Sequence, residues 1–295
     1  MTTEERLEIL ERELAAAKRA MLAHGAGAAR EEVRANRFVL EDADGKARAV
    51  LQMTEDGPRL VLNDEKGVVR VGLGVNNKLG PGLVLNDEKG VLRAVLSQEE
   101  GGSALTLFDE NGKTRAGLVL IKEGPQLLLH DENGEAGAVL VVVKGGPSLW
   151  LFDEHGKRRA VLSVIKDGAG LALRDENGEQ RATLTVVKDG AALTLNDEKG
   201  NPRAALSLEE GGSALTLNDE KGNPRAGLDV GKHGPRLRLA DENGKSRAGL
   251  AVDKNAPGLV LADVNGKARS RLLVLKDGPT LSLHDEKGKR IWQAP

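Results

Sequence analysis

The chain repeats itself every 22 residues, and this period constrains its fold more than any other feature of the sequence. The twelve-residue segment LTLNDEKGNPRA occurs twice, at residues 193–204 and 215–226. Its aspartate recurs in steps of 22 residues, with one step of 23. The twelve aspartates are Asp42, Asp64, Asp87, Asp109, Asp131, Asp153, Asp175, Asp197, Asp219, Asp241, Asp263 and Asp285. Such a period is typical of repeat proteins, in which each unit needs its neighbours to bury its apolar face.

Each unit alternates apolar and polar residues with a period of two, which is a strand pattern. Leu stands two residues before the aspartate, Leu or Phe four before, Leu nine after in eleven units, and mostly Ala seven after and Val or Leu eleven after. Arg stands six after in ten of the twelve units. The pattern predicts two short strands per unit, joined by two turns, with the apolar positions sharing one face.

The two turns differ in their residues. Matching the faces of the two strands predicts a four-residue loop after the aspartate, such as EKGN or ENGK, whose Gly supplies a positive φ angle. The second turn, KDGP or KEGP in several units, predicts a two-residue Asp-Gly or Glu-Gly hairpin loop. Pro often follows this Gly and cannot donate a ladder hydrogen bond, which weakens the second prediction.

Three architectures can cover the apolar face of such units: a parallel solenoid, a six-bladed propeller and an antiparallel meander. A solenoid would stack like charges about 4.8 Å apart, whereas a meander doubles that spacing to about 10 Å, near the Debye length. A propeller needs a period of two units, but the longest near-repeat, at Ser97 and Ser207, is offset by 110 residues, or five units. We therefore expect an all-β, elongated antiparallel meander, roughly 115 Å long for 24 strands.

The first segment is predicted to be a coiled-coil helix over residues 1–23. Apolar residues follow the heptad spacing of three and four that places one stripe along a helix. They are Leu7, Leu10, Leu14, Ala17 and Met21. A helix this short is marginal alone, so we expect it to join several chains; folding back onto its own repeats is the alternative. Residues 24–35 are predicted to be a linker, and residues 36–295 to hold the twelve repeats.

Two units depart from the pattern. In the last unit Ile291 and Trp292 replace Arg and Ala, which predicts a C-terminal cap. In the unit of Asp131, Gly137 replaces the Arg, and nearby positions expected to be polar are apolar. These are Val119, Ile121, Leu128, Val139, Val141, Val143, Trp150, Val161 and Ile165. Either neighbouring chains wrap this region, or it is an exposed patch that docks a protein or glycan.

This layout resembles the trimeric shafts of phage fibres and spikes and of bacterial surface proteins, in which a coiled coil leads into stacked β-structure. It is also similar to an uncharacterised group of bacterial proteins with a coiled coil, units such as FVLEDADGKARAVL (residues 38–51) and a final IWQAP (residues 291–295). The resemblance implies a homotrimer of the trimeric β-prism or β-helix type, in which three sheets enclose a leucine-rich axis, and it carries no activity.

The residues give little support to catalysis or cofactor binding. Five scattered His and no Cys offer no zinc or nucleophile grouping, and carboxylates repeat uniformly instead of defining one site. The DExG turns lack the EF-hand and β-roll patterns, so calcium binding there is only a weak alternative. We expect no cofactor, no metal site and no enzymatic activity.

The charge and hydropathy patterns predict neither nucleic-acid nor membrane partners. Lys and Arg number 43 against 45 Asp and Glu, and the signs are interleaved. No signal peptide or membrane-spanning segment is visible, so a cytoplasmic location, release by a non-classical route or a phage-like assembly are all compatible. We expect a structural protein that forms a fibre or filament with copies of itself; a binding module that uses residues 119–187 is the alternative.

Overall fold

The computed structural model describes residues 3–25, 33–78, 80–99, 101–254 and 256–294. Within these ranges there are one helix, α1 (Thr3–Gly25), and 24 strands. The strands are β1 (Arg37–Glu41), β2 (Ala47–Thr54), β3 (Gly57–Asn63), β4 (Val69–Asn76), β5 (Gly80–Asn86), β6 (Leu92–Glu99), β7 (Gly102–Phe108), β8 (Thr114–Ile121), β9 (Gly124–His130), β10 (Ala136–Val143), β11 (Gly146–Phe152), β12 (Arg158–Ile165), β13 (Gly168–Arg174), β14 (Gln180–Val187), β15 (Gly190–Asn196), β16 (Pro202–Glu209), β17 (Gly212–Asn218), β18 (Pro224–Gly231), β19 (Gly234–Ala240), β20 (Ser246–Val252), β21 (Pro257–Ala262), β22 (Ala268–Leu275), β23 (Gly278–His284) and β24 (Arg290–Ala294).

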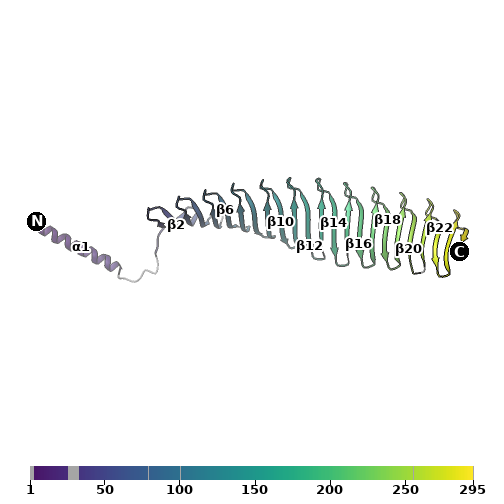
Figure 1. The fold of residues 1–295 in the computed structure, drawn as a ribbon. Helices are drawn as coiled ribbons and strands as arrows, with labels where there is room; N and C mark the ends of the chain where they lie inside the picture. Colours follow the sequence, from purple (N-terminus) through teal and green to yellow (C-terminus); the bar gives the residue numbers. More distant parts are fainter. Residues whose placement is uncertain (1–2, 26–32, 79, 100, 255, 295) are drawn as a thin grey trace.

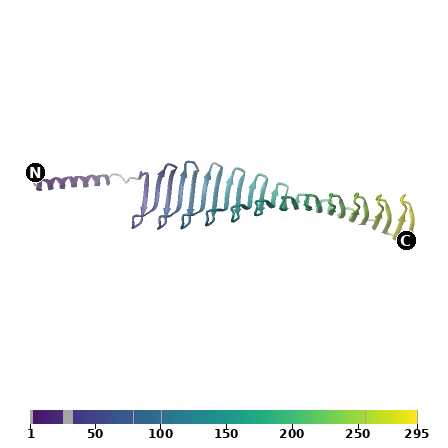
Figure 2. The same ribbon diagram turned by 90° about the horizontal axis from the view of Figure 1, so that it is seen from above.

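All the strands form one antiparallel sheet in which each pairs with its neighbours in sequence, from β1 to β24. The predicted meander is therefore confirmed. The sheet is a single long layer with β1 and β24 at its two ends (Figure 1). The strands seen nearly edge-on near the N-terminal end of the sheet in Figure 1 are seen face-on in Figure 2, and the reverse holds toward β24, so the sheet twists along its length.

Strand pairing places the regularly repeating leucines of both strands on one face, as predicted. Leu51 on β2 pairs with Phe38 on β1 and with Leu60 on β3. The residues between them alternate to the other side, where Val50 pairs with Val61. We call the two sides the leucine face and the opposite face.

The turn after each aspartate is shorter than predicted. Asp64 N–H donates to Val68 O at 2.9 Å and Gly67 N–H donates to Asp64 O at 3.0 Å, so the loop between paired residues holds three residues instead of four. Gly67 has a φ of 83°, as expected for a type I turn that ends in a left-handed glycine. The fourth residue of the predicted loop is accounted for by a bulge between the strands, where the register shifts between Leu62 and Asn63. This bulge returns the apolar residues of both strands to the same face.

The second turn holds two residues, as predicted, but lies one position earlier. Thr54 pairs with Gly57, so the loop is residues 55–56, and Gly57 already belongs to β3. A Cβ on Gly57 would lie 2.1 Å from the carbonyl oxygen of Val75 on β4. This Gly is therefore required because the neighbouring strand approaches closely, rather than as a loop residue.

The two irregular segments of the sequence fall in connections. The extra residue of the one 23-residue step lies between β4 and β5, where Asn76 pairs with Gly80. Helix α1 spans Thr3–Gly25, against a prediction of residues 1–23, and the sheet begins at Arg37. Most of the predicted linker, residues 26–32, lies outside the described residues.

The sheet has no closed core. The buried apolar side chains among the described residues are Val50, Val61, Val139 and Val141, all on the opposite face, and no large side chain is fully buried. No other element packs on either face of the sheet within the described ranges. The chain exposes 21409 Å², whereas a compact protein of its mass exposes about 12,000 Å².

Candidate functional site

The leucine face runs the length of the sheet with no other element packed on it among the described residues, and it consists of three rows of side chains. The central row carries Leu on nearly every strand, for example Leu51, Leu60 and Leu73. The Asp-turn row, beside the aspartate turns, alternates mainly Leu and Ala, as in Leu107 and Ala116. The hairpin row, beside the second turns, alternates mainly Val with Pro, Ala or Ser.

Side chains of this face remain open to solvent along the whole sheet. Central-row leucines of the even-numbered strands are 42% exposed at Leu140 and 54% exposed at Leu118, with the others from Leu51 to Leu272 between these values. Monomeric proteins rarely leave a contiguous apolar surface of this extent open. The leucine face is therefore an extended apolar surface that is open to solvent in the single chain.

The opposite face gathers the nine apolar residues singled out in the sequence. They lie on five adjacent strands, β8 to β12. Leu128, Val139, Trp150 and Val161 form one continuous row across four of these strands. The guanidinium of Arg158 lies 5.1 Å from the Trp150 ring centroid, within cation–π range.

This patch is better covered than the leucine face. Val139 is 8% exposed and Val141 is 4% exposed. Only its margin is open, with Ile165 at 59%. The residues are thus brought together as a patch, but its centre is already buried within one chain. Whether the patch docks a partner stays a prediction.

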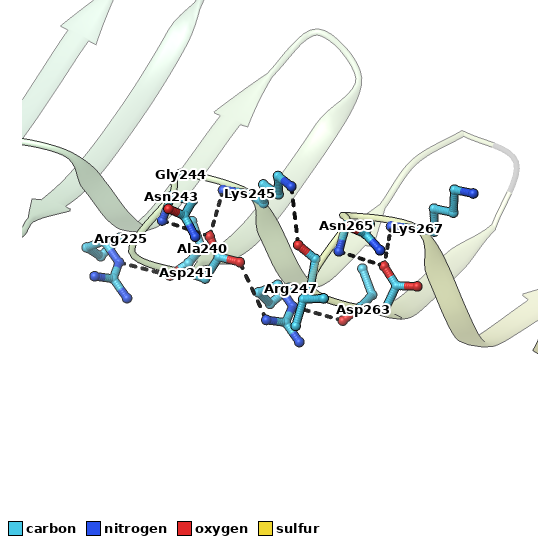
Figure 3. Close-up of polar contacts among 12 residues, drawn as sticks. Arg225, Ala240, Asp241, Asn243, Gly244, Lys245, Arg247, Asp263, Asn265 and Lys267 are labelled. Atoms are coloured by element: carbon cyan, nitrogen blue, oxygen red, sulfur yellow. Dashed lines mark hydrogen bonds and ion pairs between the residues drawn. The ribbon is translucent and has the colours of Figure 1, made fainter. Parts of the chain in front are cut away.

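The aspartate turns follow one another along one side of the sheet as a repeating polar column. Figure 3 shows two successive turns of this column. Asp241 Oδ1 accepts the N–H groups of Asn243 and Lys245 at 3.0 and 3.1 Å. Its Oδ2 lies 3.4 Å from Arg247 Nη1, and Arg247 Nε donates to Ala262 O, in the next repeat, at 3.0 Å. Seven of these arginines make the same Nε bond, and each of the seven ties its own turn to the following repeat.

Further side-chain bonds join successive repeats. Lys245 Nζ donates to Val264 O at 3.3 Å, and Lys157 and Lys267 make the same bond in their repeats. Asn218, the last residue of β17, donates from Nδ2 to the carbonyl oxygen of Pro202, the first residue of β16, at 3.0 Å. The sequence showed the Arg and Asn residues, but their carbonyl acceptors lie 15 to 16 residues away and emerge only from the register.

In eleven of the twelve repeats, the contacts of the turn aspartate favour its ionised form. The Lys157 N–H bonded to its carboxylate is the main cause that lowers the pKa of Asp153; partial burial opposes it, and the His155 N–H and the Arg159 guanidinium lower it further. The pKa is also lowered at ten other turn aspartates. They are Asp42, Asp64, Asp87, Asp109, Asp131, Asp175, Asp197, Asp219, Asp241 and Asp263.

The same bonds leave these carboxylates few free lone pairs for a metal ion. One oxygen accepts two backbone N–H groups and, in most repeats, the other faces an arginine. Within the described ranges, no three His, Cys, Asp or Glu side chains gather as metal ligands. His130 Nδ1 contacts Gly134 O, and His155 lies beside Glu154.

The predicted oligomerisation residues are open to solvent on α1. Leu7 is 59% exposed, Leu10 61% and Leu14 57%, and Ala17 is also exposed. Met21 lies on the helix, but its side chain is outside the described part. Among the described residues, no strand packs against this helix.

The predicted cap residues lie on β24. Trp292 pairs with Leu283, which places it in the Asp-turn row of the leucine face, and it is 48% exposed. Ile291 stands where most repeats have the linking Arg, and it is 63% exposed. The last repeat therefore lacks the Arg that ties other turns to a following repeat.

The chain is compared with known proteins on this structural basis. No protein-family model and no curated protein matches it. Among solved structures, it aligns with the crystal structure of TcdB2-TccC3-Cdc42 at 11% identity and a TM-score of 0.19, over 86% of this chain and 16% of that one. TcdB2-TccC3 aligns at 10% identity and a TM-score of 0.19, over 88% and 15%. The chain thus spans about a sixth of those chains, and a likeness this distant carries no functional argument.

The membrane prediction has one structural counterpart. Within the described ranges, no helix is both long and apolar enough to cross a membrane.

Proposed function

We propose that this protein is a non-enzymatic structural subunit that assembles with copies of itself into a rigid β-shaft, with the leucine faces inside and the α1 helices joined as a coiled coil. The observation that carries the proposal is the leucine face, which is open across all twelve repeats. Covering this apolar surface is the main favourable term available to the chain, because one sheet has no closed core of its own.

A copy of the same chain is the partner that fits this face best. A cover must be about as long as the sheet, roughly 115 Å, and must match its repeat along that length. Helix α1, 23 residues long, spans only about 35 Å and could cover a third of the face. Another copy has both the length and the repeat.

The turn column supports a mechanical role for the shaft. Hydrogen bonds run continuously along the sheet through the backbone ladders, and Arg and Lys side chains add further bonds between consecutive repeats. A structure that depends on nearest-neighbour contacts gains stiffness when each contact is doubled in this way. The proposed role is a spacer or fibre segment, similar to the fibre shafts that the sequence resembles.

The experiment compares two adjacent positions on β12 that point to opposite faces. Leu162→Lys places a charge on the leucine face, and Ser163→Lys places the same charge on the opposite face. Light scattering of the full chain should show an oligomer for the parent protein and for Ser163→Lys, and a smaller mass for Leu162→Lys, because an unpaired buried charge is strongly unfavourable. A parent protein that is monomeric at all concentrations would refute the proposal.

A second candidate function, docking of another protein or a glycan, rests on the patch at β8 to β12. The observation in its favour is the indole of Trp150 beside Arg158, since Trp and Arg are enriched at interaction hot spots. Replacement of Trp150 by Ala should then abolish capture of the ligand and leave the oligomeric mass unchanged. A loss of assembly instead would mean that the region is buried within the shaft.

A further inference from the structure

The leucine face carries a size pattern that points to how its copies meet. On odd-numbered strands the Asp-turn row holds Leu, and the hairpin row holds a small residue; on β9 these are Leu129 and Pro125. On even-numbered strands the order is reversed, with a small residue in the Asp-turn row and a larger one in the hairpin row, as with Ala138 and Val142 on β10. The alternation holds with few exceptions, among them Val71 on β4.

This pattern is complementary between copies related by rotation about the long axis. Such a rotation brings the Asp-turn row of one sheet against the hairpin row of the next, and the central rows together at the axis. When the copies are in register, Leu faces Pro, Ala or Ser at one level, and Ala faces Val, Leu or Met at the next. Large side chains then meet small ones throughout, as close packing requires.

A shift along the axis loses this fit. If one copy slides by a single strand, Leu faces Val at one level and Ala faces Pro at the next, which overpacks one layer and leaves a void in the other. If it slides by a whole repeat, the sizes still match, but two strands at each end remain uncovered. The fully covered arrangement with matched sizes is the in-register one.

Helix α1 selects the parallel orientation. Two antiparallel copies, with β1 facing β24, would also match large with small residues. Their α1 helices, however, would be attached at opposite ends of a shaft roughly 115 Å long. Eleven residues separate Gly25 from Arg37, a reach of at most about 40 Å. The exposed stripe at Leu7, Leu10 and Leu14 finds partners readily only when all helices start from the same end.

The bulk of the central row favours three copies over two. Two packed sheets lie about 10 Å apart over their whole width, so each has about 5 Å of depth everywhere. Three sheets with strands about 24 Å long enclose a triangle whose faces stand roughly 7 Å from the axis, and they converge at the corners. Space is then greatest where every strand presents Leu, and least at the edges, where Leu or Val alternates with Ala or Pro.

We infer that three chains associate in parallel and in register around a common axis, with central-row leucines at the axis and each Asp-turn row packed against the hairpin row of the next chain. This inference rests on the proposed self-association. The sequence already leads us to expect a homotrimer, and the size pattern adds the direction and register of the chains and the rows that meet. Three equivalent chains in a closed ring must run in the same direction, which agrees with the orientation that α1 selects.

Cysteine cross-linking tests this arrangement, because the chain contains no native Cys. Leu272→Cys lies in the central row of β22, far from the middle of the shaft. Leu273→Cys is the matched control, since it follows on the same strand and points to the opposite face. Each full-length variant is treated with a short bis-maleimide. Leu228→Cys, in the central row of β18, repeats the test if the first variant does not fold.

The expected result is efficient cross-linking of Leu272→Cys to itself and little for Leu273→Cys. Because one bis-maleimide joins two of three thiols at a level, cross-linked chains should level off at about two-thirds, with a native mass three times the 31.3 kDa of one chain. Complete conversion to cross-linked pairs with the mass of two chains would overturn the threefold arrangement and leave self-association standing.

Mixed variants test direction. In an antiparallel dimer, β22 of one chain faces β3 of the other, so Leu272→Cys would cross-link to Leu60→Cys supplied on a differently tagged chain. The parallel arrangement predicts no such product, and its appearance would overturn the inference. The mass of a single chain for the parent protein, together with no cross-linking at all in the variants, would instead overturn the proposed self-association itself.

Discussion

Truncation of two neighbouring leucines on β22 should reverse the usual relation between burial and lost stability. Leu272, the more exposed of the two in a single chain, should be the more costly to truncate, and Leu273 the less costly. In one chain, Leu272 on the leucine face is 46% exposed, whereas Leu273 is less exposed and packs over Gly258, where an added Cβ would lie 2.4 Å from Leu273 Cδ2. If the chain acted alone, Leu273→Ala would be the more costly change.

Assembly changes this order. The open part of Leu272 amounts to roughly 80 Å², so covering it contributes about 2 kcal/mol per chain at 25 cal/mol per Å². Leu272→Ala forfeits most of that contribution and leaves a cavity at the axis, for a total of about 3 kcal/mol per chain. With three chains at each level, the loss approaches roughly 9 kcal/mol per trimer. We expect about 1 to 2 kcal/mol per chain for Leu273→Ala.

The assay is sedimentation equilibrium combined with urea unfolding at several protein concentrations. Leu272→Ala should raise the dissociation constant of the oligomer by several orders of magnitude and make unfolding more dependent on concentration. Leu273→Ala should lower the unfolding midpoint slightly without shifting dissociation. A larger effect from Leu273→Ala than from Leu272→Ala would refute the argument that the leucine face is covered.

Three further outcomes follow from the turns and the close contacts. Folding lowers the pKa of eleven turn aspartates. Their contribution to stability should therefore be complete above the unfolded pKa of about 3.9 and be lost as pH falls through the lower folded values. Circular dichroism can follow acid unfolding, and unfolding that begins above pH 5 would contradict this expectation. Gly102→Ala should destabilise the protein by several kcal/mol, because the new Cβ would lie 1.7 Å from Leu120 O. Gly134→Ala should cost only about 1 to 2 kcal/mol, because it meets no neighbour and is strained only by its positive φ angle. Equal melting temperatures for the two variants would contradict the packing of the hairpins. Arg225→Gln should destabilise the turn of Asp219 only slightly, because solvent screens this partly exposed ion pair, and chemical denaturation can measure the change. A large loss of stability would contradict the exposure of this turn.

The meander could be predicted because every repeat carries the same local signals. Alternation of Leu with polar residues fixes which face each side chain takes, and an offset of five units between the best-matching repeats excludes paired blades. A single-layer sheet then follows from short connections, since each strand can reach only its neighbours.

The turns show why the remaining details escaped the sequence. A four-residue loop and a three-residue loop followed by a bulge both place Leu62 and Val71 on the same face. The alternation of residues in the sequence therefore cannot distinguish the two. The sequence predicts the Gly at the start of β3 as a loop residue, because Gly is common in hairpin turns. In the structure this Gly lies in the strand, where an added Cβ would collide with the carbonyl of Val75 on β4. Contacts between repeats, such as Arg247 to Ala262, depend on that register.

The candidate site was only partly predictable for a related reason. Apolar residues on both faces near β10 drew attention to the patch around Val139, because it breaks the repeat. One chain already buries the centre of that patch, while the uniform leucines remain open. Relative exposure depends on side-chain height and on neighbours across the sheet, which sequence spacing does not give.

Small-angle scattering of the intact chain, which gives mass and length together, tests the central claim most directly. Assembly through the leucine face predicts a rod with the mass of three chains, each of 31.3 kDa, whose long dimension exceeds the roughly 115 Å of the sheet. A particle with the mass of one chain, whether compact or extended, would contradict the claim that other copies cover this face.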